Sequence, residues 1–112
     1  MAGSLRGRPR RGEIWHYRFD APDKRRPVVV LTRQRALPLL RTAMVAPVTS
    51  TIRGLPSEVV VGVDEGLKHD SAINLDHVQT VEQRLLHRYV GSLSEAKMRR
   101  VCRALALATG CA

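Results

Sequence analysis

The stretch that most constrains the fold is an uninterrupted aliphatic run, residues 28–31, directly behind Arg25, Arg26 and Pro27. The run does not alternate with polar residues and is rich in valine, which is typical of a strand buried on both faces. Pro27 keeps the residue before it out of the α region, and proline is tolerated at the start of a strand. The sequence therefore predicts a core strand over residues 25–32 that holds Arg26 as a fixed cation where a loop meets the strand.

Other stretches carry strand patterns of their own. Residues 13–19 alternate and place Trp15 and Phe19 on one face, which could stack bases but is more typical of a core face in a chain with 4% aromatic residues. Residues 42–48 form an apolar strand in which Pro47 predicts an edge position or a bulge. Further strands are predicted over residues 55–63, 71–75, 77–81 and 88–92.

After residue 93, the spacing of the apolar residues changes to the 3.6-residue period of a helix. Ser94 is a good helix N-cap, and Gly110 supplies a stop signal. Between them, the helical apolar stripe consists of Met98, Val101, Cys102, Leu105 and Ala108. Short strands followed by one helix predict a mainly β chain, with a small, strongly bent antiparallel sheet or partly open barrel and a C-terminal helix.

The chain of 112 residues suits a single domain. We place this domain over residues 11–112. The preceding segment, residues 1–10, is basic and glycine-rich, and we predict that it is a disordered arm. No apolar stretch reads as a secretory signal or reaches membrane-spanning length, and the two cysteines have neither zinc-site nor disulfide-framework spacing. These features indicate a cytoplasmic protein.

The net charge of +9 comes mainly from arginine, which supplies sixteen of the nineteen basic residues. Such an excess favours a polyanionic partner, and arginine suits bidentate contact with phosphate. A basic surface without a specific partner is the alternative, but nucleic acid is the better interpretation.

The residues that suggest chemistry are Arg26 and a run of three hydroxyl side chains, Thr49, Ser50 and Thr51. If strands 27–32 and 43–49 pair antiparallel, the end of one lies beside the start of the other. A guanidinium and several hydroxyl donors would then share a pocket suited to phosphate. The residues alone leave open a simple anion-binding patch. The four histidines are scattered; two could meet as an acid–base couple, although nothing in their spacing indicates it.

These residues resemble the MazF/PemK-type toxins of toxin–antitoxin systems, whose fold is shared with the gyrase poison CcdB. The resemblance covers about residues 11–110. It is carried, in family order, by Arg11-Gly12-Glu13-Ile14-Trp15, Arg26-Pro27-Val28-Val29-Val30, Ala46-Pro47-Val48-Thr49-Ser50, Leu55-Pro56-Ser57-Glu58-Val59, Asp70-Ser71, Asp76-His77-Val78-Gln79-Thr80-Val81 and Val90-Gly91-Ser92-Leu93.

The resemblance implies an SH3-like β-barrel homodimer that cleaves single-stranded RNA without a metal or other cofactor. The ribose 2′-OH attacks its own phosphorus and leaves a 2′,3′-cyclic phosphate and a 5′-OH. Arg26 matches the catalytic arginine and Thr49 the catalytic threonine. The expected substrate contacts are Arg25, as a phosphate-steering neighbour, together with Ser50, Thr51, Ser71, His77 and Gln79.

Two segments depart from the family pattern. The loop over residues 20–25 is short and has no glycine or glutamate, and His77 and Gln79 stand where the family usually has Gln and Arg. The expected partner is an acidic antitoxin whose disordered tail occupies the basic groove. A gyrase-binding toxin of the same fold and a nucleic-acid-binding module without catalysis are the alternative functions.

Overall fold

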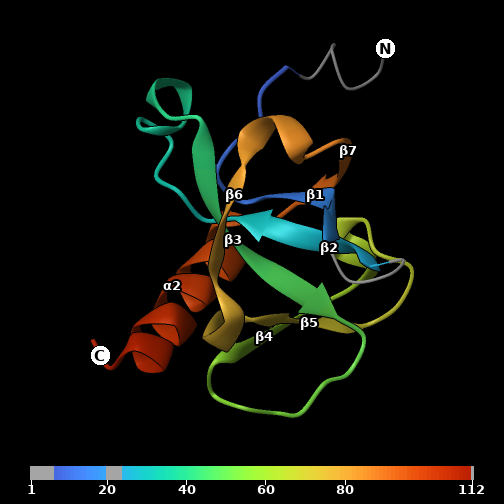
Figure 1. Cartoon of the computed structure of the whole chain (residues 1–112). Helices are drawn as coiled ribbons and strands as arrows, with labels where there is room; N and C mark the ends of the chain where they lie inside the picture. Colours follow the sequence, from blue (N-terminus) through green and yellow to red (C-terminus); the bar gives the residue numbers. More distant parts are fainter. Residues whose placement is uncertain (1–6, 20–23, 112) are drawn as a thin grey trace.

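A computed structural model describes residues 7–19 and 24–111 of the chain (Figure 1). Within these ranges a seven-stranded antiparallel sheet is followed by one long helix. The strands are β1 (Glu13–Phe19), β2 (Lys24–Val30), β3 (Thr42–Thr49), β4 (Glu58–Val61), β5 (Ser71–Asn74), β6 (Gln79–Glu82) and β7 (Arg88–Ser92). The helix is α2 (Glu95–Thr109), and short 3-10 turns are η1 (Leu37–Leu39), η2 (Val63–Glu65), η3 (Leu75–His77) and η4 (Gln83–Leu85).

The sheet is organised around β3. Its main order is β4-β5-β3-β2-β1-β7, and β6 pairs with β3 off this path. Along one edge β3 pairs with β6 through Thr42–Val45 and then with β5 through Val48 and Thr49. This change of partner bends the sheet into a half-barrel (Figure 1). The prediction of a mainly β fold with a C-terminal helix is confirmed.

Pro47 does not lie on an edge strand, the first of the two predicted positions, because β3 pairs with β2 on its other side and Val28 faces Pro47 there. The proline instead falls where β3 passes from β6 to β5, between the last pair with β6 at Val45 and the first pair with β5 at Val48. No ladder hydrogen bond is required of its nitrogen at such an interruption, so a proline is tolerated within a central strand.

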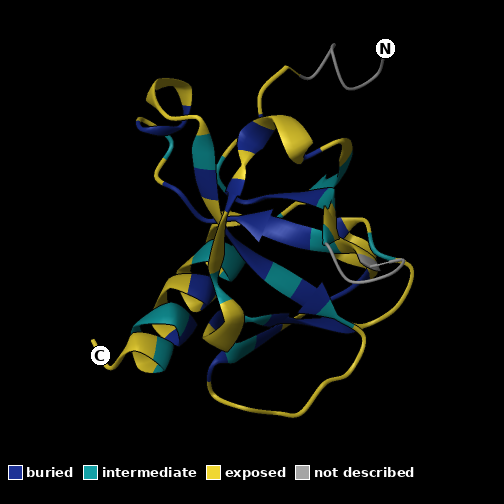
Figure 2. Ribbon diagram, viewed as in Figure 1, coloured by how far each residue is buried: buried dark blue, intermediate teal, exposed yellow. Residues whose placement is uncertain are grey.

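Two apolar clusters lie on the two faces of the bent sheet. Val28 and Val30 belong to one, with Trp15, and Val29 and Leu31 to the other. Figure 2 shows β2 buried along much of its length. The prediction of a strand buried on both faces is therefore confirmed, and Trp15, 2% exposed, is a core residue.

The helix begins and ends where its sequence signals indicated. The Ser94 hydroxyl accepts a hydrogen bond from the backbone N–H of Lys97 at 3.1 Å, and Gly110 adopts a left-handed φ of 75°. Val101 and Ala104 are buried in the cluster that contains Val29. The helical spacing predicts Cys102 on the apolar stripe, but this residue is exposed and accepts a hydrogen bond from a guanidinium nitrogen of Arg11.

Some strand boundaries differ from the sequence-based ones. β2 already begins at Lys24, so Pro27 lies inside the strand, opposite His16. β4 begins only at Glu58, because one carboxylate oxygen of this residue accepts the backbone N–H groups of residues 53–55 and curls the chain before the strand. β5 and β6 are separated by η3, where the Asn74 side chain accepts the backbone N–H of Asp76.

Residues 1–6 of the expected disordered arm and residues 20–23 of the short loop lie outside the described residues. The remaining arm residues run against the domain: Pro9 is buried, and the backbone N–H of Arg10 donates to Glu13 at 2.8 Å. In the described ranges, no helix is both long and apolar enough to cross a membrane.

Candidate active site

The antiparallel register brings Arg26 and Thr49 together. In the β2–β3 ladder Val28 faces Pro47 and Val30 faces Val45. Continuing the same register by two residues places Arg26 opposite Thr49, and residues opposite each other in an antiparallel pair lie on the same face of the sheet. The juxtaposition that strand pairing predicted is therefore present. The guanidinium lies on an exposed residue, and Thr49 is half-buried.

Arg26, Thr49 and Thr51 form a ridge between two adjoining cavities. The first cavity, of about 550 Å³, also includes His16, Ser50, Ser71, Lys68 and His69, and we call it the His16 cavity. The second, of about 310 Å³, includes Arg53, Glu58, Asn74 and His77, and we call it the His77 cavity. An extended ligand lying across the ridge would therefore present one group to the guanidinium and its two neighbouring parts to separate cavities.

The hydroxyl of Thr49 is oriented by the chain that follows it. Its oxygen accepts the backbone N–H of Thr51 at 3.2 Å. A hydroxyl group has one donor and two acceptor positions, so the hydrogen of this hydroxyl stays available to donate. The structure gives it no acceptor among the described residues. Beside it, the guanidinium of Arg26 makes no hydrogen bond or ion pair within the same described part of the chain, so both groups can bind an anion.

The far wall of the His16 cavity is a loop fixed by buried contacts. The wall includes residues 66–69, directly after η2. The buried carboxylate of Glu65 accepts the backbone N–H of Gly62 at 2.7 Å and lies 3.7 Å from the ammonium of Lys97 on α2. Gly66, with a φ of 91°, lies so close to β7 that a Cβ there, or at Gly91, would overlap backbone of the other segment. Helix and sheet together therefore hold this wall in place.

His16 is a site residue that sequence reasoning did not single out. It lies on β1 opposite Pro27 of β2 and Arg88 of β7, and it is one of the residues that line the His16 cavity. This register places its side chain on the face of Pro27, the opposite face of the sheet from Arg26. Burial, followed by the charges of His87, Arg25 and Arg88, lowers the pKa of His16 below its ordinary value of 6.5. The only sequence signal for His16 is that it lies in a strand next to the one that carries Arg26. To use this signal, one has to know the register in which the two strands pair.

The other expected contacts divide into two groups. Ser50, Thr51 and Ser71 line the His16 cavity, and His77 lies in the second cavity with its Nδ1 atom 2.7 Å from Nδ2 of Asn74. Arg25 and Gln79 line neither cavity. Arg25 instead faces Arg18 across the β1–β2 ladder, and Gln79 is exposed on β6 opposite Val45.

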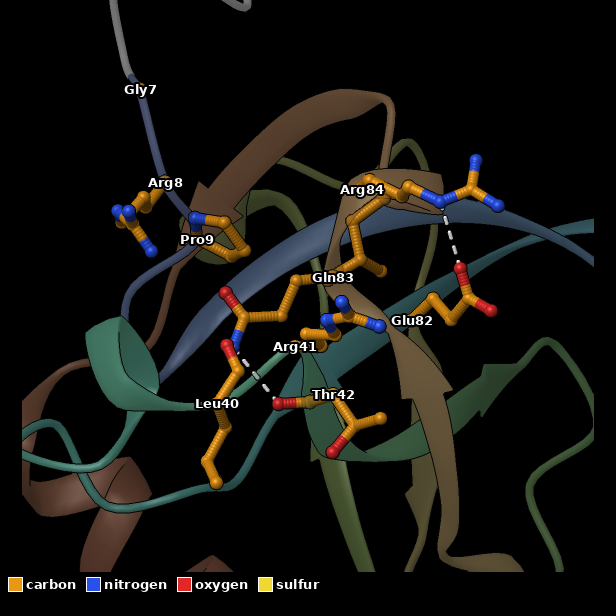
Figure 3. A pocket seen from close by; sticks show the side chains of 10 residues that line it. Gly7, Arg8, Pro9, Leu40, Arg41, Thr42, Glu82, Gln83 and Arg84 are labelled. Carbon is orange, nitrogen blue, oxygen red and sulfur yellow. Dashed lines mark hydrogen bonds and ion pairs between the residues drawn. The ribbon is translucent and has the colours of Figure 1, made fainter.

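A third cavity, of about 750 Å³, lies at the opposite end of β3 (Figure 3). Its floor is the side chain of Gln83, whose Nε2 atom lies 2.9 Å from the carbonyl oxygens of Leu37 and Thr42 and 3.1 Å from that of Leu40. Arg84 at its rim forms a 2.8 Å ion pair with Glu82. We call it the Gln83 cavity. Figure 3 marks contacts of this kind for Gln83 and for Arg84, and draws none for Arg8 or Arg41.

The chemistry available at the ridge is anion binding and charge stabilisation. A guanidinium and hydroxyl donors suit a phosphate group and the charge that develops on it during displacement. Among the described residues, no three histidine, cysteine, aspartate or glutamate side chains form a group that could hold a metal ion.

Comparisons with known proteins agree on one family. Residues 10–109 match the family described as the PemK-like, MazF-like toxin of type II toxin–antitoxin systems. The chain is 49% identical over 105 residues to the probable endoribonuclease MazF5 of Mycobacterium tuberculosis, covering 92% of this chain and 94% of that protein.

Solved structures give the same result. The Mycobacterium tuberculosis toxin MazF-mt6 superposes with a TM-score of 0.81 at 35% identity, covering 88% of this chain and 96% of that one. An endoribonuclease in complex with its cognate antitoxin, from a mycobacterial species, has a TM-score of 0.81 at 24% identity, covering 91% of this chain and 95% of that chain, and shows the likeness of fold alone.

Proposed function

This chain belongs to the PemK-like, MazF-like family of type II toxin–antitoxin toxins, and from that premise we propose that it is the toxin of such a system, an endoribonuclease that cleaves single-stranded RNA. The observation that carries the proposal is the ridge where Arg26 and Thr49 stand opposite each other, with donors free to bind a phosphate and a cavity on each side. The positive charge of the chain, +9, favours the same substrate.

In the proposed reaction, the scissile phosphate lies on the ridge. The 2′-oxygen of the preceding ribose attacks phosphorus, the bond to the 5′-oxygen breaks, and the products carry a 2′,3′-cyclic phosphate and a 5′-OH. Arg26 stays protonated at neutral pH, so it acts by stabilising the negative charge that grows on the phosphate oxygens. Thr49 donates its free hydroxyl hydrogen to one of these oxygens and holds the phosphate in line for attack.

The flanking nucleotides occupy the two cavities. Ser50, Thr51 and Ser71 offer hydroxyl groups to the nucleotide in the His16 cavity, and His77 with Asn74 offers a polar edge to the other nucleotide. Arg25 and Gln79 lie outside both cavities and would contact RNA only beyond these nucleotides. The protein acts as a homodimer and is inhibited by an acidic antitoxin, because a polyanionic segment is attracted to the same basic surface.

The test is cleavage of mixed RNAs by the purified protein in EDTA, followed by analysis of the product ends. We expect 2′,3′-cyclic phosphate and 5′-OH ends, and we expect cleavage to disappear in Arg26→Ala and Thr49→Ala. Arg8→Ala, in the Gln83 cavity, is a matched control that removes a basic residue remote from the ridge and should cleave as the wild type does.

Other outcomes would contradict the proposal. Tight binding of RNA that stays intact would favour a nucleic-acid-binding module, and intact RNA together with a stable complex with gyrase would favour a gyrase-binding toxin. Cleavage that depends on an added divalent cation, and stops in EDTA, would contradict the metal-independent chemistry.

A further inference from the structure

We infer that an arginine patch on the side of α2 binds the phosphate backbone of RNA outside the cleavage site, so that a long RNA is bound more tightly than a short one. The patch consists of Arg11, Arg99 and Arg103. The inference deepens the proposed function and rests on it, because it adds a second contact with the same substrate.

The first support is geometric, because the three side chains line one cavity of about 480 Å³ between α2 and the residues before β1. Arg99 and Arg103 are exposed and lie one turn apart on the same face of α2, with Cβ atoms about 5–6 Å apart. This spacing is similar to the separation of successive phosphate groups along an RNA strand. The two guanidiniums can therefore bind neighbouring phosphates.

The guanidinium of Arg11 is fixed where β2 ends beside α2. Its Nη1 atom donates to the carbonyl oxygen of Leu31, and its Nη2 atom donates to Sγ of Cys102 at 3.3 Å. The backbone N–H of Arg11 donates to the side chain of Gln34 at 2.8 Å. A guanidinium has five N–H donors, so these contacts hold the group in place and still leave donors for a phosphate.

The positive charge of the patch is not balanced within the part of the chain that the structure describes. There, neither Arg99 nor Arg103 forms an ion pair or a side-chain hydrogen bond, and the ion pairs of that part lie elsewhere. Glu95 is the one carboxylate among the described residues that line the cavity, and no ion pair joins it to the arginines. Two more exposed arginines, Arg33 and Arg35, lie in the segment after β2. Such an excess of cations attracts a polyanion.

The distribution of charge along α2 does not serve the stability of the helix. Cations stabilise a helix from its last turn, where α2 has no basic residue. Arg99 and Arg103 instead repel each other, because like charges four residues apart are neighbours on a helix surface. A phosphate chain lying across both side chains would remove this repulsion, so the two positions suit binding better than they suit folding.

The patch lies far from the ridge. Arg11 contacts Leu31, which follows Arg26 by five residues, and a strand rises about 3.3 Å per residue, so roughly 16 Å separate the two positions along β2. The arrowhead of β2 points toward α2 (Figure 1). An RNA that fills only the ridge and its two cavities does not extend this far, whereas a longer RNA does. The length of the RNA is therefore the variable that tests the patch.

The experiment compares two lengths of one RNA that the wild type cleaves, about 4 and about 16 nucleotides, with the cleavage site in the middle of each. The patch variant is Arg99→Gln/Arg103→Gln. Arg41→Gln/Arg84→Gln is a matched control that removes the same charge from the Gln83 cavity. We expect the patch variant to raise KM for the long RNA about tenfold at an unchanged kcat, because two exposed charge contacts are lost. The control should resemble the wild type with both RNAs, and the patch variant should do so with the short one.

Equilibrium binding tests the patch without cleavage. The probe is the long RNA with a 2′-deoxyribose at the cleavage site, which lacks the attacking hydroxyl and stays intact. The logarithm of the binding constant falls with the logarithm of the salt concentration by about 0.7 for each phosphate contact with a single strand, so the slope should be smaller by about 1.4 in the patch variant. Arg99→Lys/Arg103→Lys keeps both charges and should keep most of the slope, which a merely structural role would not predict. Circular dichroism confirms that each variant is folded.

Several results would overturn the inference. One is a wild-type KM for the long RNA in the patch variant, and another is an equal rise in KM for both lengths of RNA. An equal loss of binding in the control would show that net charge alone matters. If the patch variant lost binding of poly-glutamate but kept binding of the long RNA, the patch would belong to an acidic protein instead. Absence of cleavage by the wild type would overturn the proposed function itself, while the intact probe would still report on the patch, so the two failures are distinguishable.

Discussion

The two ends of β3 carry cavities that are built in opposite ways. At the Thr42 end, two polar side chains of the larger cavity are already bonded, Gln83 against three carbonyl oxygens and Arg84 against Glu82. At the Thr49 end, the Arg26 guanidinium and the Thr49 hydroxyl hydrogen have no partner among the described residues. The larger cavity thus has at its centre a buried group, Gln83, that holds neighbouring segments together, whereas the two groups on the ridge keep unused donors.

This difference teaches that volume is a poor guide to function in a small basic protein. The Gln83 cavity exceeds the His16 cavity in size, about 750 Å³ against about 550 Å³, and it also contains arginines. What separates the two is the state of the central polar group, because Gln83 is already bonded and a satisfied polar group gains little from a ligand, whereas Arg26 and Thr49 keep unused donors. Substitutions at the two ends should therefore change different measured quantities.

The largest effect is expected at the Thr49 end. Arg26→Gln keeps a hydrogen-bond donor but removes the charge, and it should lower single-turnover cleavage by about 10²–10³-fold, as the loss of one preorganised stabilising group does. The midpoint of urea unfolding should stay close to that of the wild type, because this exposed side chain has no partner to lose among the described residues. A variant that is equally active, or one that is destabilised, would contradict the comparison.

At the Thr42 end we expect a smaller effect, a loss of stability without a loss of cleavage activity. Gln83→Met keeps the size of the side chain but takes the Nε2 donor away from three carbonyl oxygens, of which that of Leu37 keeps the backbone N–H of Leu40 as a donor. We expect the free energy of unfolding to fall by about 2–3 kcal/mol. Urea unfolding measures this loss, and cleavage per folded molecule should stay at the wild-type level. A drop in that specific activity would mean that the Gln83 cavity also takes part in RNA cleavage.

The pH dependence of the free energy of unfolding gives a further test of the Thr49 end. The pKa of His16 is lowered in the folded protein, so between its folded value and the unfolded value near 6.5 the unfolded chain binds more protons. Stability from this residue is fully present above the unfolded value and is lost as the pH falls toward the folded one. His16→Gln should remove that part of the pH dependence of unfolding, whereas His69→Gln should retain it. If the free energy of unfolding of His16→Gln depends on pH as that of the wild type does, the His16 ring titrates alike in the folded and unfolded states.

The smallest effect is expected for the ion pair at the rim of the Gln83 cavity. Both side chains are largely exposed, 76% for Arg84 and 53% for Glu82, so solvent screens the attraction between them. Arg84→Gln should change the free energy of unfolding by less than about 0.5 kcal/mol and leave cleavage unaltered. Thermal unfolding and the cleavage assay, run in parallel, would expose a larger role in either property.

The sequence predicted the parts of the fold that depend on local patterns. The valines of β2 are buried on both faces as their run indicated, and α2 begins after Ser94 and ends before Gly110 because cap residues act over a few neighbours. The meeting of Arg26 and Thr49 also followed, because it requires only that two strands near in sequence pair antiparallel.

Other features depend on register and on distant contacts, which local patterns do not contain. His16 comes to line a cavity beside the ridge only because β1 pairs with β2 in one particular alignment, in which it lies opposite Pro27. Gln83 reaches carbonyl groups more than forty residues earlier in the chain. The place of Pro47 at a change of strand partner could not be predicted, because a strand that changes its partner halfway leaves no mark in the sequence.

The contact between Gly66 and Gly91 has a consequence for how this protein can vary. Neither position can accept a side chain, because a Cβ at either one would overlap the opposing backbone. Two exposed neighbours on the same loop, Lys68 and His69, have no such limit. Substitution at these two positions can therefore change the side chains that the wall presents to the cavity, while the backbone contact that fixes the wall stays the same.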